Sequence, residues 1–386
     1  MANPIYKALG STVFDTMSAL ARETGAINLG QGFPDQQGPE ALRRAAGRAL
    51  MEGSNQYPPM RGLPVLREAA AEHYARHQDT AFGADGVLVT SGATEAIAAS
   101  LLALITPGDE VVIFEPAYDA YRPLIARAGG QARAVALQPP GWRIDAAALE
   151  AAITPRTRAI LFNDPLNPAA RAFSDDERRI LADACVRHDL YAICDEVWEH
   201  VLFDGRAHRS LAALPGMEGR AVKIGSAGKI FSMTGWKVGF ACGAPDLIEL
   251  IARAHQYLTF TTPPALQEAV AEGMSWPQDW YAEMRAGYQR SRDRLAAGLR
   301  EAGWAVLPSE ATYFLNIDLA ASGVTQDDTA FCETIVREHG VAGIPVSAFY
   351  GGQGPSHIVR LCFAKKDAVL DEAVERLGRA REVMRG

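Results

Sequence analysis

The stretch Ala221-Val222-Lys223-Ile224-Gly225-Ser226-Ala227-Gly228-Lys229 joins a short apolar strand pattern to a lysine surrounded by small residues. Small residues let the backbone approach a bulky ligand closely. A hydroxyl stands three positions before Lys229, at Ser226, and a second cation stands eight positions after it, at Lys237. Burial and a nearby cation both lower the pKa of a lysine amine, which can then condense with a carbonyl. The stretch therefore predicts either a Schiff-base lysine beside a phosphate or a surface loop with two solvated lysines.

Similar apolar segments recur along the chain and alternate with helical stretches. A helix is expected over residues 94–104, entered through Ser91-Gly92-Ala93. Nearly continuous apolar strands separated by helices indicate a mostly parallel sheet covered by helices on both faces. The sequence therefore predicts an α/β fold for the larger part of the chain. The expected strands are residues 86–90, 109–114, 159–162, 191–194 and 221–224.

Polar residues follow three of these strands directly. Asn163, Asp195 and Ser226 each come after a different apolar segment. In parallel sheets, ligands bind at the carboxyl ends of the strands. These distant residues are therefore expected to meet at one rim of the sheet.

The pattern changes near both ends of the chain. Residues 1–40 are expected to be largely irregular, and a long charged helix is expected over 281–302. Residues 313–318 and 357–363 alternate like half-buried strands. We therefore predict an N-terminal arm and part of a small domain (1–40), a large domain (41–280) and a small α+β domain (281–386).

Composition excludes several classes of function. The formal net charge of -8 argues against a nucleic-acid or anionic-membrane partner. The five cysteines show no CxxC spacing, and the eight histidines show no metal-ligand spacing, so no metal site is expected. Scattered cysteines are typical of reduced thiols, and the N-terminus lacks a secretion-signal pattern, so a cytoplasmic location is expected. No apolar run approaches the roughly 20 residues that span a bilayer.

Two segments of the large domain carry further candidate binding groups. Ala93 and Thr94 open a helix after a strand, where free N–H groups bind an anion or accept an ordinary N-cap. Asp195 ends a buried strand and needs a cationic partner, such as a protonated pyridine nitrogen, unless it caps a following helix. Its neighbour Glu196 is expected to be a helix-face or structural carboxylate.

Two other polar residues are candidates for substrate or cofactor contacts. Asn167 precedes a proline, which holds its backbone extended, so its amide can be directed at a ligand, unless the segment is only a turn. Arg360 lies in an alternating apolar strand, where its planar guanidinium must find an anion. That anion is either the carboxylate of a substrate or an internal Asp or Glu.

Read together, these motifs resemble the fold-type I aminotransferases of class I/II, which depend on pyridoxal 5′-phosphate (PLP). The closest resemblance is to the kynurenine, glutamine and methionine aminotransferase group, and it covers nearly the whole chain. It is carried by Asn28-Leu-Gly-Gln-Gly-Phe-Pro-Asp35, Tyr57-Pro-Pro-Met-Arg-Gly62, Asn163 to Pro168, Asp195-Glu-Val197, Ser226-Ala-Gly-Lys229, Gly235-Trp-Lys237 and Arg360.

The resemblance implies a role for each matching residue. Lys229 would be the Schiff-base lysine and the proton carrier, and Asp195 would pair with the pyridinium nitrogen of PLP. Asn167 would donate to the phenolic oxygen of PLP. The remaining cofactor contacts would be Tyr118, stacked on the ring, and the phosphate-binding residues Ala93, Thr94, Ser226 and Lys237.

The resemblance also implies how the substrate and a second subunit are bound. Arg360 and Asn167 would contact the substrate, Arg360 through the substrate carboxylate, and Gly32 would close the site near it. Tyr57 would reach the phosphate in the neighbouring subunit of a homodimer. Among the aromatic residues, Tyr57, Tyr118, Tyr121, Phe260 and Tyr313 are candidates to line an apolar pocket, or to belong to the core or an interface.

The chain departs from the family pattern at two places. Many relatives have Tyr where this chain has Trp198, so Asn167 is expected to be the main donor to the phenolic oxygen. In the pair Ala169-Ala170, Gly is usual at the second position. The path of this loop is therefore left open by the sequence.

The expected activity is ping-pong transamination between an L-amino acid and a 2-oxo acid. No second arginine is assigned to a side-chain carboxylate, which favours methionine, glutamine, phenylalanine or kynurenine as the donor. The same residues would also serve a cysteine-conjugate C–S β-lyase. A non-catalytic PLP-binding sensor is the remaining alternative.

Overall fold

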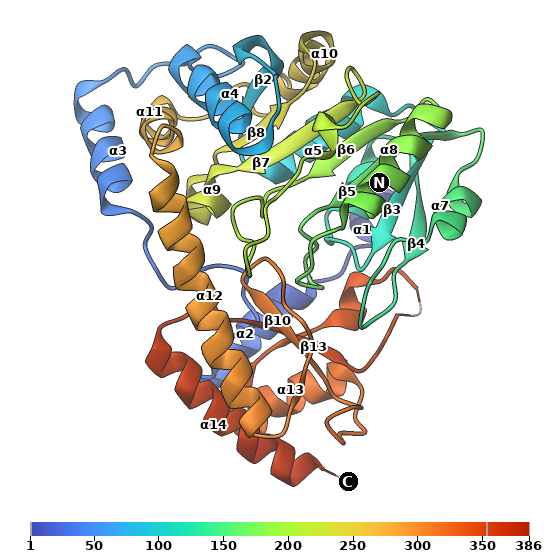
Figure 1. Ribbon diagram of the computed structural model, residues 1–386, viewed down its shortest axis with the longest axis vertical. Helices are drawn as coiled ribbons and strands as arrows, with labels where there is room; N and C mark the ends of the chain where they lie inside the picture. The colour runs from blue at the N-terminus through green and yellow to red at the C-terminus, as the bar shows by residue number, and fades with distance from the viewer. Residues whose placement is uncertain (1, 353, 386) are drawn as a thin grey trace.

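The computed structural model describes residues 2–352 and 354–385. Its centre is a seven-stranded sheet with the order β2-β8-β7-β6-β5-β3-β4 (Figure 1). Only β8 runs antiparallel to its neighbours. The strands are β2 (Val87–Thr90), β3 (Glu110–Glu115), β4 (Gln131–Ala136), β5 (Thr157–Asn163), β6 (Tyr191–Asp195), β7 (Ala221–Ser226) and β8 (Gly239–Cys242).

Both faces of this sheet are covered, as the apolar strands predicted. On β3, Val111 and Ile113 pack into one core, together with helices α5 and α10. The alternate residues Val112 and Phe114 pack into a second core with α8. The helices of this part are α3 (Glu40–Glu52), α4 (Pro64–Gln78), α5 (Ala93–Leu104), α6 (Tyr121–Arg127), α7 (Ala146–Ala152), α8 (Asp175–Arg187), α9 (Ala227–Ile230), α10 (Pro245–His255) and α11 (Pro264–Met274).

A smaller four-stranded antiparallel sheet, with the order β12-β13-β10-β9, lies below the large sheet in Figure 1. The helix α12 runs from one part of the molecule to the other (Figure 1). The domain boundaries near residues 40 and 280 stay predictions. The elements are β9 (Ala305–Val306), β10 (Phe314–Asp318), β12 (Ile344–Pro345), β13 (Ile358–Cys362), α12 (Gln278–Glu301), α13 (Asp328–His339) and α14 (Asp367–Met384).

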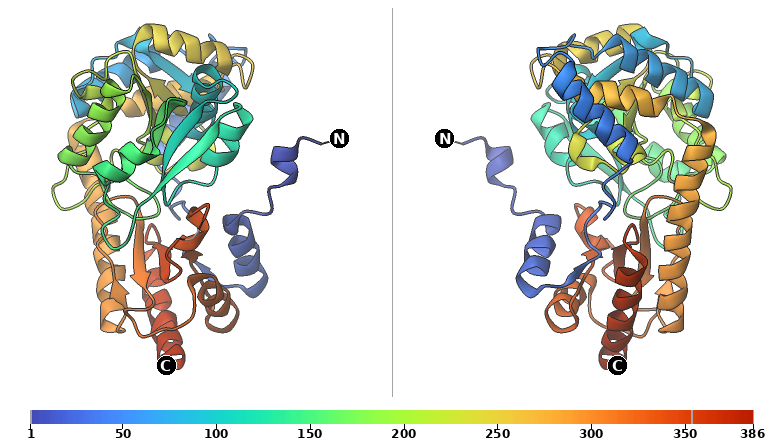
Figure 2. Two further views of the ribbon diagram at one scale, coloured as in Figure 1. Left: turned by 90° about the vertical axis from the view of Figure 1, so that its right-hand side faces the viewer. Right: turned by 90° about the vertical axis from the view of Figure 1, so that its left-hand side faces the viewer.

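The N-terminal segment is more regular than its sequence suggested. It forms α1 (Pro4–Lys7), α2 (Val13–Thr24) and β1 (Ile27–Asn28), and β1 pairs in parallel with β11 (Val341–Ala342). The expectation of an irregular segment was therefore wrong, because α2 is capped by the Thr12 side chain and buries four residues. Helix α1 has no buried residue and projects at the side of the molecule, where it contacts α6 (Figure 2).

The five strands expected in the large sheet are confirmed, with ends within two residues of those predicted. Two strands were missed: β4, which is mostly exposed at the sheet edge, and the short β8. The strands β10 and β13 are buried almost throughout rather than half-buried. The expectation of one solvated face was wrong because helices pack on this sheet, α12 on β10 and α13 on β13.

A buried ion cluster joins β6 and β7 beneath the rim of the large sheet. The Nζ of Lys223 is 3.1 Å from Glu196 and also contacts Glu199, and all three side chains are buried. Burial alone would raise the pKa of Glu196, but the positive charges of Lys223 and His208 lower it to about 2. Glu196 is thus the structural carboxylate that the sequence indicated. Removing one partner from such a cluster costs several kcal/mol, because the other charge stays buried.

Candidate active site

The predicted meeting of strand ends is confirmed. In the register of the sheet, Asn163 at the end of β5 pairs with Asp195 at the end of β6. The next strand, β7, ends at Ser226. These ends open into a cavity of about 230 Å³, lined by Gly92, Ala93, Thr94, Ile97, Tyr118, Asn163, Asn167, Asp195, Val197, Trp198, Ser226, Lys229, Thr234 and Lys237.

Lys229 points its amine into this cavity from the short helix α9. Its Nζ donates to the hydroxyl of Tyr313 at 3.0 Å and to the carbonyl oxygen of Gly32 at 3.2 Å. Burial lowers the pKa of this amine to about 8, and the positive charges of Arg360 and Lys237 act in the same direction. The alternative of a solvated surface lysine is therefore wrong for Lys229. The amine is a nucleophile or base that can work near neutral pH.

Asp195 carries a buried carboxylate with one unused oxygen. Its Oδ2 accepts a hydrogen bond from the Tyr121 hydroxyl, but its Oδ1 has no partner in the described residues. Burial raises the pKa of Asp195 to about 6. The chain after Asp195 forms a turn over residues 197–200 rather than a helix, so the helix-capping alternative is wrong. A cationic N–H donor from a ligand in the cavity would satisfy Oδ1 and keep the carboxylate ionised.

The start of α5 forms an anion cradle at the same cavity. Gly92, at φ 79°, precedes the helix, and no side chain caps the free N–H groups of the first turn. A Cβ at Gly92 would lie 3.2 Å from the Nζ of Lys237, which places this cation against the helix start. Ala93, Thr94 and Ser226 line the cavity as well. An uncapped helix start beside a lysine is suited to a phosphate.

Arg360 orients the amide of Asn167. Its Nη1 donates to the Oδ1 of Asn167 at 2.7 Å, and its Nη2 donates to the carbonyl oxygen of Gly30 at 2.7 Å. With the amide oxygen occupied in this way, the Nδ2 group of Asn167 is left to donate within the cavity.

No internal carboxylate neutralises Arg360. In residues 2–352 and 354–385, no Asp or Glu forms an ion pair with it, so the internal-anion alternative is wrong. The guanidinium is 1% exposed, and its Nε has no partner in the described chain. Burial lowers the pKa of Arg360 to about 10. A buried cation of this kind calls for an anionic ligand.

The two departures from the family pattern have definite geometry. The indole of Trp198 packs edge-on against Tyr313, with ring centroids 4.4 Å apart, and its face lies 4.6 Å from the Nζ of Lys229. Ala170 adopts φ 58°, in the left-handed region that favours glycine. Alanine in this conformation costs about 1 kcal/mol, which explains why Gly suits that position.

Three predicted site residues do not line the cavity of this chain. Gly32 and Arg360 reach it through Lys229 and Asn167, respectively. Tyr57 lies on the surface, 85% exposed, with its ring 5.5 Å from that of Phe260. Thus neither Tyr57 nor Phe260 lines the cavity that contains Lys229.

The sequence left the site contacts of several residues unassigned, and it offered Tyr121 only as a candidate for an apolar pocket, the core or an interface. The contact of Tyr121 with Asp195 joins positions 74 residues apart, and no sequence signal predicts it. Thr234 lies between Lys229 and Lys237, so the motif itself could have pointed to it. Asn163 was expected at the rim and also accepts a hydrogen bond from the backbone N–H of Asn167 at 2.8 Å. The apolar wall adds Ile97 and Val197.

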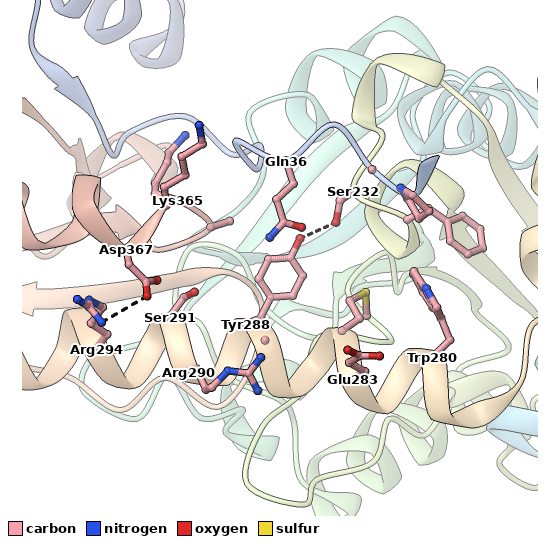
Figure 3. Close-up of a pocket in the computed structure, with 17 residues that line it drawn as sticks. Gln36, Ser232, Trp280, Glu283, Tyr288, Arg290, Ser291, Arg294, Lys365 and Asp367 are labelled. Carbon is pink, nitrogen blue, oxygen red and sulfur yellow. Dashed lines mark hydrogen bonds and ion pairs between the residues drawn. The ribbon is translucent and has the colours of Figure 1, made fainter. Parts of the chain in front are cut away.

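A separate, larger cavity of about 730 Å³ lies along α12. Figure 3 shows Tyr288 in this cavity with its hydroxyl directed at Ser232. The charged side chains around it include Glu283, Arg290 and Arg294, and Arg294 is paired with Asp371. It lacks the buried, unpartnered polar atoms that mark the smaller cavity.

Within the described ranges, no cluster of three or more His, Cys, Asp or Glu side chains could hold a metal ion. None of the helices in these ranges combines the length and the apolar character needed to cross a bilayer.

The raised pKa of Asp195 predicts a pH-dependent stability of the ligand-free protein. The pKa of Asp195 is about 6 in the folded protein and has an ordinary value of 3.8, so folding favours the protonated carboxyl group. The contribution of this group to the free energy of unfolding is therefore highest below about pH 4, and it is lost as the pH rises through 6. Asp195→Asn removes the penalty and should exceed the parent in unfolding free energy by about 3 kcal/mol at pH 7.

Urea unfolding of both proteins between pH 4.5 and 7.5 measures this difference. The gap should widen with pH, whereas Asp176→Asn, at a side chain that is 85% exposed, should leave the pH profile unchanged. Parallel profiles for the parent and Asp195→Asn would show that Asp195 is not held in a raised-pKa state.

Comparison with known proteins extends over nearly the whole chain. Residues 24–377 match the family Aminotransferase class I and II. A probable N-succinyldiaminopimelate aminotransferase of Mycobacterium tuberculosis is 46% identical over 95% of both chains. The methionine aminotransferase of Escherichia coli is 42% identical over 96% of both chains.

Solved structures agree. The Escherichia coli protein described as having a methionine aminotransferase function superposes with a TM-score of 0.95 at 41% identity, over 98% of this chain and 99% of that one. The family match and the fold lead to one assignment: the protein belongs to the class I and II aminotransferases, a family whose members use pyridoxal 5′-phosphate.

Proposed function

We propose that this aminotransferase moves the amino group of a neutral or aromatic L-amino acid to a 2-oxo acid by a ping-pong mechanism. The observation that carries the proposal is that one cavity contains both the Lys229 amine and the Oδ1 of Asp195, which has no hydrogen-bond partner in the described chain. An amine with a pKa of about 8 and a buried acceptor are two groups that transamination requires.

The residues of the cavity suit PLP. When bound, PLP supplies an aldehyde for the amino group and a protonated ring that acts as an electron sink. Asp195 would hold the proton on the ring nitrogen through Oδ1, and Asn167 would donate to the phenolic oxygen. Tyr118 would cover the ring. The phosphate would be bound by Ala93, Thr94, Ser226 and Lys237.

Lys229 would hold the cofactor covalently at rest and move the proton during the reaction. Its neutral amine removes the α-proton of the donor as a general base, and the resulting ammonium returns a proton as a general acid. Such catalysis contributes about 10²–10⁴-fold in rate. The lowered pKa makes both forms of this amine accessible near neutral pH.

Arg360 would bind the carboxylate shared by all amino acid donors. Its guanidinium is buried without an internal carboxylate, and a bidentate ion pair with the substrate would supply the missing anion. The carbonyl of Gly30 and the amide of Asn167 hold the guanidinium in place. Gly32, two residues along the same loop, would close over the bound substrate.

The composition of the cavity supports a neutral or aromatic donor side chain. Its wall includes the apolar residues Ile97, Val197 and Trp198. The cations among its lining residues are Lys229 and Lys237, and both have proposed roles toward the cofactor. No cation is left there for a side-chain carboxylate. We therefore favour methionine, glutamine, phenylalanine and kynurenine over acidic donors.

Adding amino acids one at a time to the PLP-loaded protein tests the proposal through its visible spectrum. Neutral and aromatic donors should bleach the visible band in the absence of an acceptor, whereas aspartate should not. Lys229→Ala should lose both this response and turnover while keeping the circular dichroism of the parent. The control Lys366→Ala, an exposed lysine outside the cavity, should behave like the parent.

The same titration distinguishes the alternatives. Fast bleaching by N-succinyl-diaminopimelate and none by methionine would overturn the neutral-donor assignment. Pyruvate and ammonia released from a cysteine conjugate without an acceptor would indicate the C–S β-lyase. Turnover retained by Lys229→Ala would overturn the role of this lysine.

We further propose that the chain acts as a homodimer in which Tyr57 reaches the phosphate bound by the neighbouring subunit. Tyr57 lies on the surface next to Phe260, away from the cavity of its own chain. Two large apolar side chains close to Phe260 in the sequence are also exposed: Tyr257 at 86% and Leu258 at 44%. Exposed apolar groups concentrated in this way are typical of a protein interface.

Subunit complementation tests the role of Tyr57. Tyr57→Ala should weaken PLP binding, and Lys229→Ala should be inactive. In mixed dimers, the subunit carrying Tyr57→Ala keeps its own Lys229 and receives an intact Tyr57 from its partner. Mixing and reassociating the two variants should therefore restore up to one native site per mixed dimer. PLP affinity and activity no higher than in the unmixed variants would show that Tyr57 does not act between subunits.

The cytoplasmic location is also a proposal. All five cysteines are buried as free thiols. This state is typical of a reducing compartment.

A further inference from the structure

The amine of Lys229 has two acceptors in the structure. The hydroxyl of Tyr313 lies 3.0 Å from Nζ and the carbonyl oxygen of Gly32 lies 3.2 Å from it. Tyr313 in turn donates its own proton to the carbonyl of Gly32 at 2.6 Å. The three groups therefore form a closed triangle, in which the oxygen of Tyr313 is left to accept from the lysine.

The number of acceptors matches the number of N–H groups. A neutral amine has two N–H bonds and one lone pair, and its lone pair is the base. When Tyr313 and Gly32 take both N–H bonds, the lone pair remains for the α-proton of the donor. Burial raises the pKa of the Tyr313 phenol, so it stays protonated and keeps its donor bond to Gly32.

The two acceptors are held rigidly. Tyr313 is 1% exposed, and its ring packs edge-on against Trp198 at 4.4 Å. A Cβ at Gly32 would lie 3.2 Å from the ring of Phe314, so this loop sits directly on the start of β10. In the small sheet, β10 pairs with β13, the strand that carries Arg360. The small sheet therefore positions both the acceptors for the Lys229 amine and Arg360, the arginine proposed to bind the substrate carboxylate.

We propose that Tyr313 and the carbonyl of Gly32 form a holding site for the free Lys229 amine, which makes Tyr313 a positioning residue for proton transfer. The inference rests on the role proposed above for Lys229. In the step itself, the C–H bond of the donor breaks and an N–H bond forms on Lys229. The electron pair stays with the donor carbon, and the new ammonium later gives a proton back.

Tyr313→Phe removes the acceptor and keeps the ring that packs against Trp198. Tyr288→Phe is the matched control, because Tyr288 is also a buried tyrosine but bonds Ser232 in the other cavity (Figure 3). The single-turnover rate with an amino acid donor should fall about 10–100-fold in Tyr313→Phe, since misplacing a catalytic group costs rate on this scale. The α-deuterium isotope effect should rise, while the concentration of donor at half-maximal rate should change less than about twofold.

A second readout uses the PLP-free protein and no catalysis. The pH dependence of Lys229 acetylation by acetic anhydride, followed by mass spectrometry, gives the pKa of the amine. An acceptor stabilises the charged ammonium more than the neutral amine. Tyr313→Phe should therefore lower the pKa of Lys229 below the parent value, and Tyr288→Phe should not. More of the amine would then be neutral at pH 7, yet proton transfer would be slower, as expected for lost orientation.

The outcomes separate the two proposals. An unchanged isotope effect and an unchanged pKa in Tyr313→Phe, with Lys229→Ala inactive, would overturn the holding site and leave the role of Lys229 intact. A faster single turnover in Tyr313→Phe would also overturn it, because the lowered pKa alone would then account for the effect. Active Lys229→Ala would overturn both proposals. Equal losses in Tyr313→Phe and Tyr288→Phe would show a merely structural contribution.

Discussion

The carboxylate of Asp195 is the constraint on which the site depends. Taking a carboxylate out of water is costly unless donors or a cation replace the lost hydration. Here one oxygen is satisfied by Tyr121, and the other faces the cavity without a partner in the described chain. The folded chain therefore tolerates a group whose pKa is raised to about 6. Bound PLP would relieve the cost of the buried, unpartnered carboxylate through its ring nitrogen. The relief of this cost would contribute to the binding free energy of the cofactor.

The surroundings of Asp195 keep it in this position. The strands β5, β6 and β7 are neighbours in the large sheet, and the buried ion cluster of Lys223, Glu196 and Glu199 ties two of them together directly below the rim. Outside the residues that line the cavity, the small sheet and the N-terminal loop supply Arg360, Tyr313 and Gly32, which hydrogen-bond to Asn167 and Lys229. The cavity thus lies in the part of the fold built on the large sheet, and the small sheet and the N-terminal loop hold the side chains of Lys229 and Asn167 from outside it.

Much of this site could be predicted because it follows from strand ends. Apolar strands separated by helices indicated a parallel sheet, and its carboxyl ends brought Asn163, Asp195 and Ser226 together as expected. The contacts that complete the site depend instead on packing between distant segments, such as those of Tyr121 with Asp195 and Tyr313 with Lys229. Local patterns carry no signal for them. For the same reason, the sequence left β4 and the burial of β13 unrecognised, since edge position and covering helices are properties of the whole fold.

The most direct test of this account is the protonation state of the cofactor ring. The ¹⁵N chemical shift of the ring nitrogen in ¹⁵N-labelled PLP, bound to the parent protein and to Asp195→Asn, reports whether that nitrogen carries a proton. The account predicts a protonated nitrogen in the parent at pH 7.5 and an unprotonated one in Asp195→Asn. An unprotonated nitrogen in the parent would contradict the central role given to the free oxygen of Asp195.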